Sequence, residues 1–134
     1  MSADASLRST APVFPVDDVA KTMAWYHDVL GFEPHPFPKT PPHAFCVLTR
    51  DRVEIMLQRL PGYVKPHLYG TREGGVWDVY VRMTGVHALY RELSERAGVK
   101  IVERIGKQPY GDTEFVIEDP NGYVLVFSEL VEGT

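Results

Sequence analysis

Two stretches of the sequence alternate apolar side chains with side chains that can bind or react, which is the spacing of the two faces of a β-strand. The stretches are 53–58 and 76–82. Opposite their apolar faces they carry Glu54, Met56, Gln58, Asp78, Tyr80 and Arg82. Carboxylates, an amide, a phenol and a guanidinium can orient a polar ligand or move protons. A solvent-exposed sheet face with ordinary ion pairs has the same pattern, so these side chains line a pocket only if the sheet curves into a cup.

Aromatic side chains are frequent in the segments that would surround such a cup. The tyrosines in Gly- and Pro-rich loops are Tyr63, Tyr69 and Tyr110. We expect these tyrosines to form the rim of a ligand slot. Phe45 and Phe115 lie on predicted central strands, and we expect one of the two, and also Trp77, to fill the core. Planar or cationic ligands suit aromatic walls because stacking and cation–π contacts need no reaction.

Nucleophilic and metal chemistry have little support in the sequence. Cys46 is the lone cysteine and alternates with apolar neighbours in a predicted strand, as an inert thiol does. No serine lies in a nucleophile elbow, and no Gly-rich phosphate loop is present. The five histidines do not pair at metal-ligand spacing, although His43 and His67 could reach the mouth of the cup from loops. We therefore assign no catalytic residue, no metal ligand and no cofactor.

The elements that must position these residues occur twice in the same order. Val19 and Val86 lie 67 residues apart, as do Gly31 and Gly98, and each pair marks the start and the stop of an amphipathic helix. The predicted helices cover 19–30 and 86–97. The predicted strands cover 13–16, 32–37, 44–48, 53–58, 76–82, 99–105, 114–118 and 123–127. Each half is therefore predicted to fold as a βαβββ module.

The domain organisation follows from this repeat. We expect one α+β domain over 1–134, with a first module at about 11–58, a linker at 59–75 and a second module at about 76–129. The apolar strand faces should pack under the helices. Pro12 and Pro15 predict that the first strand lies at a sheet edge or pairs irregularly, because proline lacks a donor for the ladder. The polar residues 1–10 predict a loose arm.

Composition narrows the classes of partner. The chain has 134 residues, 44% hydrophobic and 24% charged, as an ordinary globular domain has. A formal net charge of −4 gives no reason to expect nucleic acid or an anionic membrane. No apolar run is typical of a signal peptide or a membrane helix, and a single cysteine forms no internal disulfide. We expect a cytoplasmic protein.

Three motifs resemble the glyoxalase/bleomycin-resistance/extradiol-dioxygenase superfamily, also called vicinal oxygen chelate proteins. They are VDDV at 16–19, WYHDVLGF at 25–32 and DPNGY at 119–123, and the resemblance covers about 11–129. It implies two βαβββ modules, each an open, curved, mixed sheet, that form a shared cup. It also implies a homodimer, in which related folds exchange arms or domains between subunits.

The resemblance also implies where a metal would bind. Carried over by motif, the four ligand positions of metal-using members fall at Ala11, Gln58, Asp78 and Val126. Ala11 and Val126 carry no donor atom, and two oxygen ligands make a poor site for Zn²⁺, Ni²⁺ or Fe²⁺. This departure moves metal-dependent lyase, isomerase and dioxygenase chemistry out of first place.

The leading hypothesis is a metal-free, dimeric binding protein that sequesters a hydrophobic or aromatic, cationic small molecule such as an antibiotic. The predicted ligand-binding residues are His43, Phe45, Glu54, Met56, Gln58, Tyr63, Tyr69, Asp78, Tyr80, Arg82, Tyr110 and Phe115. Glu54 and Asp78 would meet cationic groups, while Arg82 and Gln58 would orient the ligand. A metal-dependent or acid–base enzyme of the same superfamily is the alternative, and a scaffold protein without a small ligand stays open as a third class.

Overall fold

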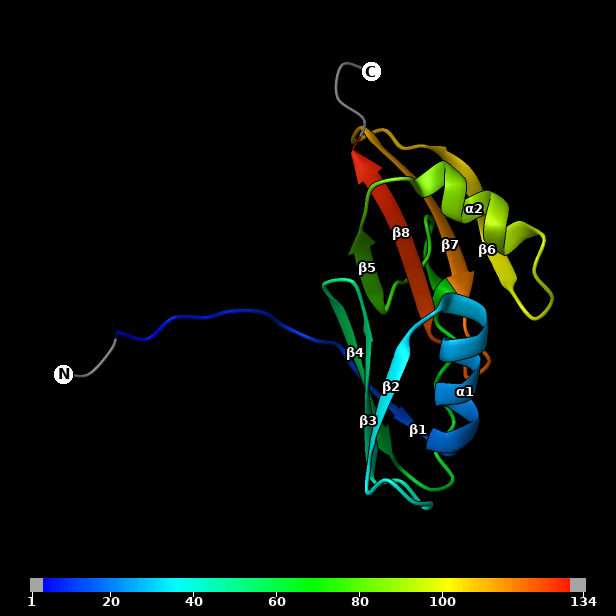
Figure 1. The fold of residues 1–134 in the computed structure, drawn as a ribbon. Coiled ribbons are helices and arrows are strands. Elements are labelled where there is room, and N and C mark those ends of the chain that lie inside the picture. The colour runs from blue at the N-terminus through cyan, green and yellow to red at the C-terminus, as the bar shows by residue number, and fades with distance from the viewer. Residues whose placement is uncertain (1–3, 131–134) are drawn as a thin grey trace.

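The computed structural model describes residues 4–130 and contains two successive βαβββ modules (Figure 1). The first module comprises β1 (Val13–Val16), α1 (Val19–Leu30), β2 (Glu33–Phe37), β3 (Phe45–Arg50) and β4 (Val53–Arg59). The second comprises β5 (Val79–Arg82), α2 (Val86–Ser94), β6 (Lys100–Lys107), β7 (Asp112–Glu118) and β8 (Val124–Leu130). A short 3-10 helix, η1 (Tyr69–Thr71), lies between the modules. The expected α+β class is confirmed; the first three residues of the predicted arm lie outside the described residues.

The first sheet has the strand order β1-β4-β3-β2 and is mixed. β1 runs parallel to β4 at the sheet edge, as its prolines predict, and the other pairs are antiparallel. α1 begins where the Asp18 carboxylate accepts the Lys21 amide at 3.0 Å, and it ends at Gly31 in the left-handed region. Leu48, Ile55 and Leu57 are fully buried beneath this helix, so strand alternation has placed the apolar face as predicted.

The second sheet repeats this arrangement with the order β5-β8-β7-β6. β5 is parallel to β8, and β7 pairs antiparallel with both β8 and β6. The register between β6 and β7 shifts twice, between Ile101 and Glu103 and again between Glu103 and Gly106. Such irregularities bend a strand and add curvature to the sheet.

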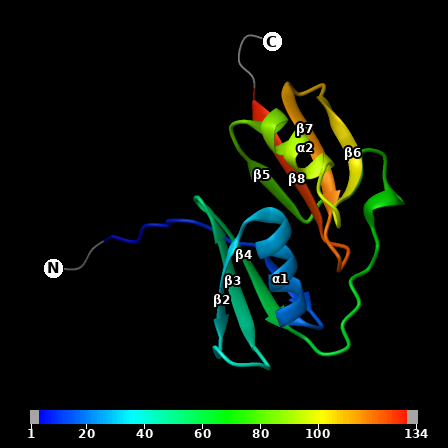
Figure 2. The same cartoon turned by 45° about the vertical axis from the view of Figure 1, so that its right-hand side comes forward.

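The helices of both modules lie on the same side of their sheets (Figures 1 and 2). The opposite face of each sheet, which we call the outward face, is turned away from the helices. The main core lies between helices and sheets and includes both modules. A smaller buried cluster of Val116, Val124 and Val126 lies on the outward face of the second sheet, with Tyr69 and Tyr80 packed against it. This outward face is therefore partly covered by Tyr69, the first residue of η1.

Buried polar contacts join α1 of the first module to the β7–β8 turn of the second. The Tyr26 hydroxyl donates to Asp119 Oδ2 at 2.6 Å, and both residues are buried. Asn121 Nδ2 donates to Thr22 Oγ1 at 2.9 Å. Phe14 and Tyr123 stack with ring centroids 4.1 Å apart. The Asp-Pro-Asn-Gly turn therefore joins the two modules as well as connecting two strands.

Two elements, β5 and α2, are three residues shorter than expected, and one aromatic side chain lies elsewhere than expected. β5 begins at Val79 instead of residue 76, because pairing with β8 begins there. Trp77 therefore precedes the strand and is 43% exposed, so the prediction that it fills the core is wrong. α2 ends at Ser94 instead of residue 97, because the next residues form a turn in which the Arg96 amide donates to Leu93 O at 3.2 Å. No helix among the described residues is long and apolar enough to cross a membrane.

Candidate functional site

The outward face of the first sheet carries four of the predicted site residues. Glu54, Met56 and Gln58 alternate with the buried Ile55 and Leu57 along β4, as predicted. The fourth, on the neighbouring strand, is Phe45, which pairs with Gln58 in register and stacks on Phe37 with ring centroids 5.6 Å apart. This face is open and mixed in character: Phe37 is 61% and Phe45 36% exposed, beside the polar side chains of Glu54 and Gln58.

The outward face of the second sheet holds a compact hydrogen-bonded group centred on Asp112. The Tyr80 hydroxyl donates to Asp112 Oδ2 at 2.6 Å, and the Ser128 hydroxyl donates to the same atom at 3.0 Å. Arg82 Nη1 lies 3.6 Å from this oxygen. The two hydrogen bonds, Tyr80 first, and then the arginine hold the pKa of Asp112 below its ordinary value. The site therefore presents a stable carboxylate at neutral pH.

Aromatic side chains surround this carboxylate in a hollow of about 430 Å³. The hollow is lined by Trp77, Tyr80, Arg82, Tyr110 and Asp112. Trp77 lies with its ring centroid 5.4 Å from that of Tyr80 and is tilted 48° to it, and the Arg82 guanidinium lies 5.4 Å over the same tyrosine ring. Tyr110 is 53% exposed and free to contact a ligand. A planar guest could stack in this hollow beside a carboxylate and an arginine.

A second carboxyl group on this face, that of Glu114, was not predicted from the sequence as a site residue. Glu114 pairs with Ser128 in register and is 1% exposed, and neither of its carboxylate oxygens has a hydrogen-bond partner among the described residues. Burial first, and then the neighbouring Glu103, raises the pKa of Glu114 above its ordinary value. The signal that could have revealed it is strand alternation in 112–118, which puts Asp112, Glu114 and Glu118 on the face opposite Phe115.

Four predicted residues lie on or next to the linker, or in the loop before β3, away from the hollow. Tyr63 lines a small hollow of about 220 Å³ with Pro15 and Asn121. Tyr69 packs on the outward cluster of the second sheet. Asp78 accepts the Val124 amide at 2.8 Å and lies 3.1 Å from Lys65 Nζ, so its carboxylate is already engaged. The fourth, His43, is 5% exposed, with Nδ1 2.7 Å from Pro38 O within its own loop.

Phe115 lies on the other side of the second sheet. It is fully buried, and its ring centroid is 5.1 Å from that of Tyr90 and 5.4 Å from that of Phe127. It is therefore the one of the two strand phenylalanines that fills the core. Of the twelve predicted residues, Tyr80, Arg82 and Tyr110 come together in one hollow.

The side chains at the positions where metal-using members of the superfamily carry their ligands do not suit a metal ion. Val13 and Tyr80 lie 67 residues apart, and Val13 pairs with Met56 in the first sheet as Tyr80 pairs with Val126 in the second. By strand register the counterpart of Val126 is therefore Met56, two residues before Gln58. Asp78 is held by a backbone amide and a lysine. Within residues 4–130, no group of three or more His, Cys, Asp or Glu side chains is arranged to hold a metal. The donor set is too poor for Zn²⁺, Ni²⁺ or Fe²⁺.

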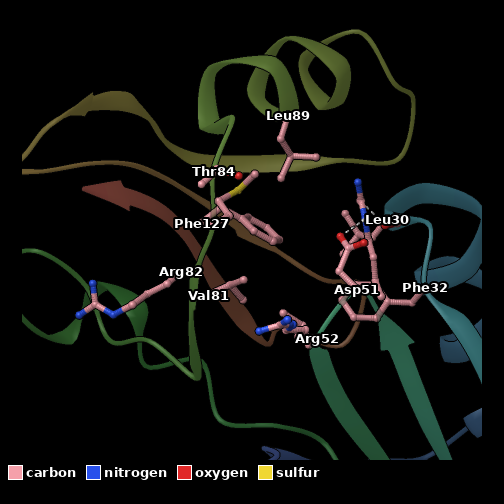
Figure 3. A pocket seen from close by; sticks show the side chains of 12 residues that line it. Leu30, Phe32, Asp51, Arg52, Val81, Arg82, Thr84, Leu89 and Phe127 are labelled. Atoms are coloured by element: carbon pink, nitrogen blue, oxygen red, sulfur yellow. Dashed lines mark hydrogen bonds and ion pairs between the residues drawn. The ribbon is translucent and has the colours of Figure 1, made fainter. Parts of the chain in front are cut away.

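A different cleft of about 420 Å³ lies on the helix side, between the β3–β4 turn and α2 (Figure 3). Its floor is apolar and includes Leu30, Phe127 and Leu89. Arg50 at its rim donates to Leu30 O at 2.7 Å, so this guanidinium is engaged within the protein. The Arg82 side chain points away from the cleft (Figure 3). The cleft has its own carboxylate, Asp51, whose side chain is 90% exposed and lies 4.0 Å from Arg50 Nε, but its aromatic rings, Phe32 and Phe127, are buried, unlike those of the Asp112 hollow.

The family model of the Glyoxalase/Bleomycin resistance protein/Dioxygenase superfamily matches residues 9–127. The chain therefore belongs to this superfamily, as the three motifs implied. Among curated proteins, no sequence matches the chain.

Solved structures support the same fold. TioX from Micromonospora sp. ML1 superimposes with a TM-score of 0.72 at 18% identity, over 92% of this chain and 99% of that one. A glyoxalase-related enzyme from Clostridium phytofermentans gives 0.72 at 17% identity, over 97% and 100%. The bleomycin-binding protein of bleomycin-producing Streptomyces verticillus, in complex with copper(II)-bleomycin, gives 0.65 at 20% identity, over 92% and 97%. At these identities the likeness establishes the fold.

Proposed function

We propose that this protein binds and sequesters a flat, cationic, aromatic small molecule, such as an antibiotic, without using a metal. The observation that carries the proposal is the Asp112 hollow, in which Trp77, Tyr80 and Tyr110 surround a carboxylate of lowered pKa. Stacking on one aromatic side chain adds about 0.5–1.5 kcal/mol beyond area burial. Arg82 lies at the same hollow and orients polar groups of the guest. The copper(II)-bleomycin complex of a protein with this fold is consistent with such a role.

We propose further that the protein acts as a homodimer. The outward face of the first sheet exposes Phe37 and Phe45, and a second copy lying over this face would remove them from water. In such a dimer, Glu54 and Gln58 on this face would form a second wall of the ligand cup. Exchange of the polar arm before β1 is one way to build this dimer.

One observation favours an acid–base enzyme as the second candidate. The buried Glu114 has a raised pKa next to a hollow, which is a property of many catalytic acids and bases. Incubation of the protein with a bound compound separates the two functions, because an enzyme converts the compound whereas a sequestering protein returns it unchanged.

The direct test is a fluorescence titration that uses Trp77 as the reporter. The probes are bleomycin and ethidium, with the anionic aromatic 8-anilinonaphthalene-1-sulfonate as the contrast. We expect the cationic probes to quench Trp77, and the quench to be absent in Trp77→Phe, which keeps Trp25 on α1. Asp112→Asn should weaken binding at least tenfold, or about 1.4 kcal/mol, because it removes the carboxylate that pairs with a desolvated cation.

The matched control is Glu73→Gln, which neutralises an exposed carboxylate outside the hollow and should leave the affinity unchanged. Absence of binding by both cationic probes would contradict the proposal. Binding of the anionic probe alone, with Arg82 required, would mean that the polarity of the hollow is the reverse of the one proposed.

A further inference from the structure

The linker between the modules is fastened to acidic residues of the second module at three points. Lys65 Nζ lies 3.1 Å from Asp78 Oδ2, and His67 Nε2 lies 3.0 Å from Glu118 Oε1. The Tyr69 hydroxyl donates to Glu103 Oε2 at 3.4 Å. We call residues 63–75 the strap; in Figure 2 it is the green segment that runs from β4 to β5 along the second module. Each fastening is a single polar contact, which binding of a ligand could replace.

The Tyr69 ring covers the part of the outward face that contains Glu114. The ring packs on the cluster of Val116, Val124 and Val126. Glu103 and Glu114 both help to raise the pKa of the Tyr69 hydroxyl after burial, so the two carboxyl groups lie next to it. Val116 pairs with Glu103 in register, and the next outward position along β7 is Glu114. Tyr69 therefore lies beside two carboxyl groups, of which Glu114 is buried and Glu103 is half-buried.

The buried carboxyl group of Glu114 has nothing to bind in this state. Both of its oxygens are inaccessible and have no hydrogen-bond partner among the described residues. Buried polar groups in proteins are nearly always paired, and an unpaired one in a native structure calls for an explanation. A nearby second carboxyl group, Glu103, adds like charge in place of a partner. The pair is the arrangement expected of an anionic subsite that lacks its cation.

The Tyr69 ring can occupy its position only because residue 75 is a glycine. A Cβ atom added at Gly75 would lie 2.3 Å from Cε1 of Tyr69, whereas a Cβ atom added at Gly74 would have no atom within 4 Å. The two glycines have nearly equal positive φ angles, +85° and +84°. A side chain at either position therefore imposes similar backbone strain, and only the one at residue 75 displaces the ring.

We propose that Tyr69 is a displaceable plug over an anionic subsite made by Glu114 and Glu103, and that an amidinium or protonated amine of the ligand takes its place. This inference rests on the proposed function and extends it by naming Glu114 as the residue that selects a cationic nitrogen group. An amidinium donates two parallel N–H groups to a carboxylate, so it supplies both missing hydrogen bonds at once. The free protein keeps the subsite closed, and the ligand opens it.

The test compares Gly75→Ala with Gly74→Ala by calorimetric titration with 4-aminobenzamidine and its uncharged analogue 4-aminobenzamide. We expect Gly75→Ala to bind the amidine at least fivefold more tightly than the unchanged protein does, because the plug is already displaced, and Gly74→Ala to match the unchanged protein. Tyr69→Ala removes the ring without strain and should act like Gly75→Ala. Glu114→Gln should remove the preference for the amidine over the amide. Equal affinities in both glycine variants, or a preference that survives Glu114→Gln, would overturn the proposal.

A second measurement needs no ligand. Carbon-13 NMR follows the titration of the Glu114 carboxyl group, and displacement of the ring in Gly75→Ala should let water reach it and lower its pKa toward the ordinary glutamate value. If the pKa of Glu114 is the same in Gly75→Ala as in Gly74→Ala, the proposal that Tyr69 is a plug is wrong. One outcome separates the two proposals: the amidine binds, Asp112→Asn weakens its binding, and Gly75→Ala leaves its affinity unchanged. In that case the plug proposal is wrong and the proposed function is supported. If no cationic aromatic binds any variant, both fail.

Discussion

At the scale of single residues, two carboxyl groups on one sheet face have opposite environments. Asp112 accepts hydrogen bonds from Tyr80 and Ser128, and its pKa is lowered. Glu114 is buried without a partner among the described residues, and its pKa is raised. An ionised carboxylate is stabilised at the first position and destabilised at the second. This contrast gives the face one ionised carboxylate that Tyr80, Ser128 and Arg82 hold in place and one that lacks a partner among the described residues.

The environment of Glu114 predicts a pH-dependent stability change in Glu114→Gln. Because the folded protein binds the Glu114 proton more tightly than the unfolded chain does, this residue lowers the free energy of unfolding as pH rises from about 4.3 through its folded pKa. Glutamine removes that penalty, so the variant should be more stable by about 1 kcal/mol at pH 7, at the lower end of the cost of a buried unpaired group because its amide is also buried. The gain should vanish below about pH 4.

Urea unfolding at pH 4 and pH 7 measures this difference. Glu54→Gln, which changes an exposed carboxylate on the first sheet, is the matched control and should alter stability little at either pH. A Glu114→Gln variant that loses stability at pH 7 would mean that the carboxylate has a partner in the folded protein.

Alternation along strands predicted the sheet face of some candidate site residues and not of others. It correctly put Tyr80 and Arg82 on the outward face of β5, since polar and apolar residues differ clearly there. On β7 all seven residues are buried, so the burial of its residues does not distinguish the two faces of the strand. Phe115 was therefore predicted as a ligand-binding residue, although it is the neighbouring Glu114 that lies on the outward face. Trp77 was wrongly expected in the core, because its exposure depends on where pairing with β8 begins.

At the scale of elements, the contact between α1 and the β7–β8 turn fixes the modules to each other. The Asp119 carboxylate accepts the amides of Asn121 and Tyr123 at 2.8 and 2.9 Å, and its other oxygen accepts the Tyr26 hydroxyl. The motif residues of the turn therefore hold the turn together and also join the modules.

We predict that Tyr26→Phe destabilises the protein by about 1–3 kcal/mol, because it leaves a buried carboxylate oxygen without its donor. Thermal and urea unfolding measure the loss. Tyr90→Phe is the control: it makes the same change on α2, where the hydroxyl has no hydrogen bond to a described residue, and it should cost less than about 0.5 kcal/mol, as a change away from such features does. Equal losses in the two variants would show that the Tyr26–Asp119 hydrogen bond contributes nothing.

At the scale of the whole molecule, the exposed outward face of the first sheet predicts association. Light scattering at micromolar concentration should give twice the chain mass of 15.1 kDa. Phe45→Glu places a charge on this face and should shift the mass toward the monomer, whereas Val64→Glu, at a more exposed position on the strap, should not. A mass of 15.1 kDa for the unchanged protein would contradict the dimer.

The repeat of elements at an offset of 67 residues predicted the architecture of the molecule, because each module has its own helix and its own strand alternation. The strap could not be predicted in the same way. Its path depends on single contacts of Lys65, His67 and Tyr69 with residues farther along the chain. Such isolated contacts leave no periodic pattern in the sequence from which they could be predicted.

The central claim is that the Asp112 hollow binds a cationic aromatic compound without a metal. The measurement that tests it most directly is a calorimetric titration of chelator-treated, metal-free protein with ethidium, followed by the same titration of Asp112→Asn. We expect binding to the metal-free protein, an affinity at least tenfold weaker in Asp112→Asn, and no gain in affinity when Zn²⁺, Ni²⁺ or Fe²⁺ is added. Binding that begins only when one equivalent of such a metal is present, or that is unchanged in Asp112→Asn, would contradict it.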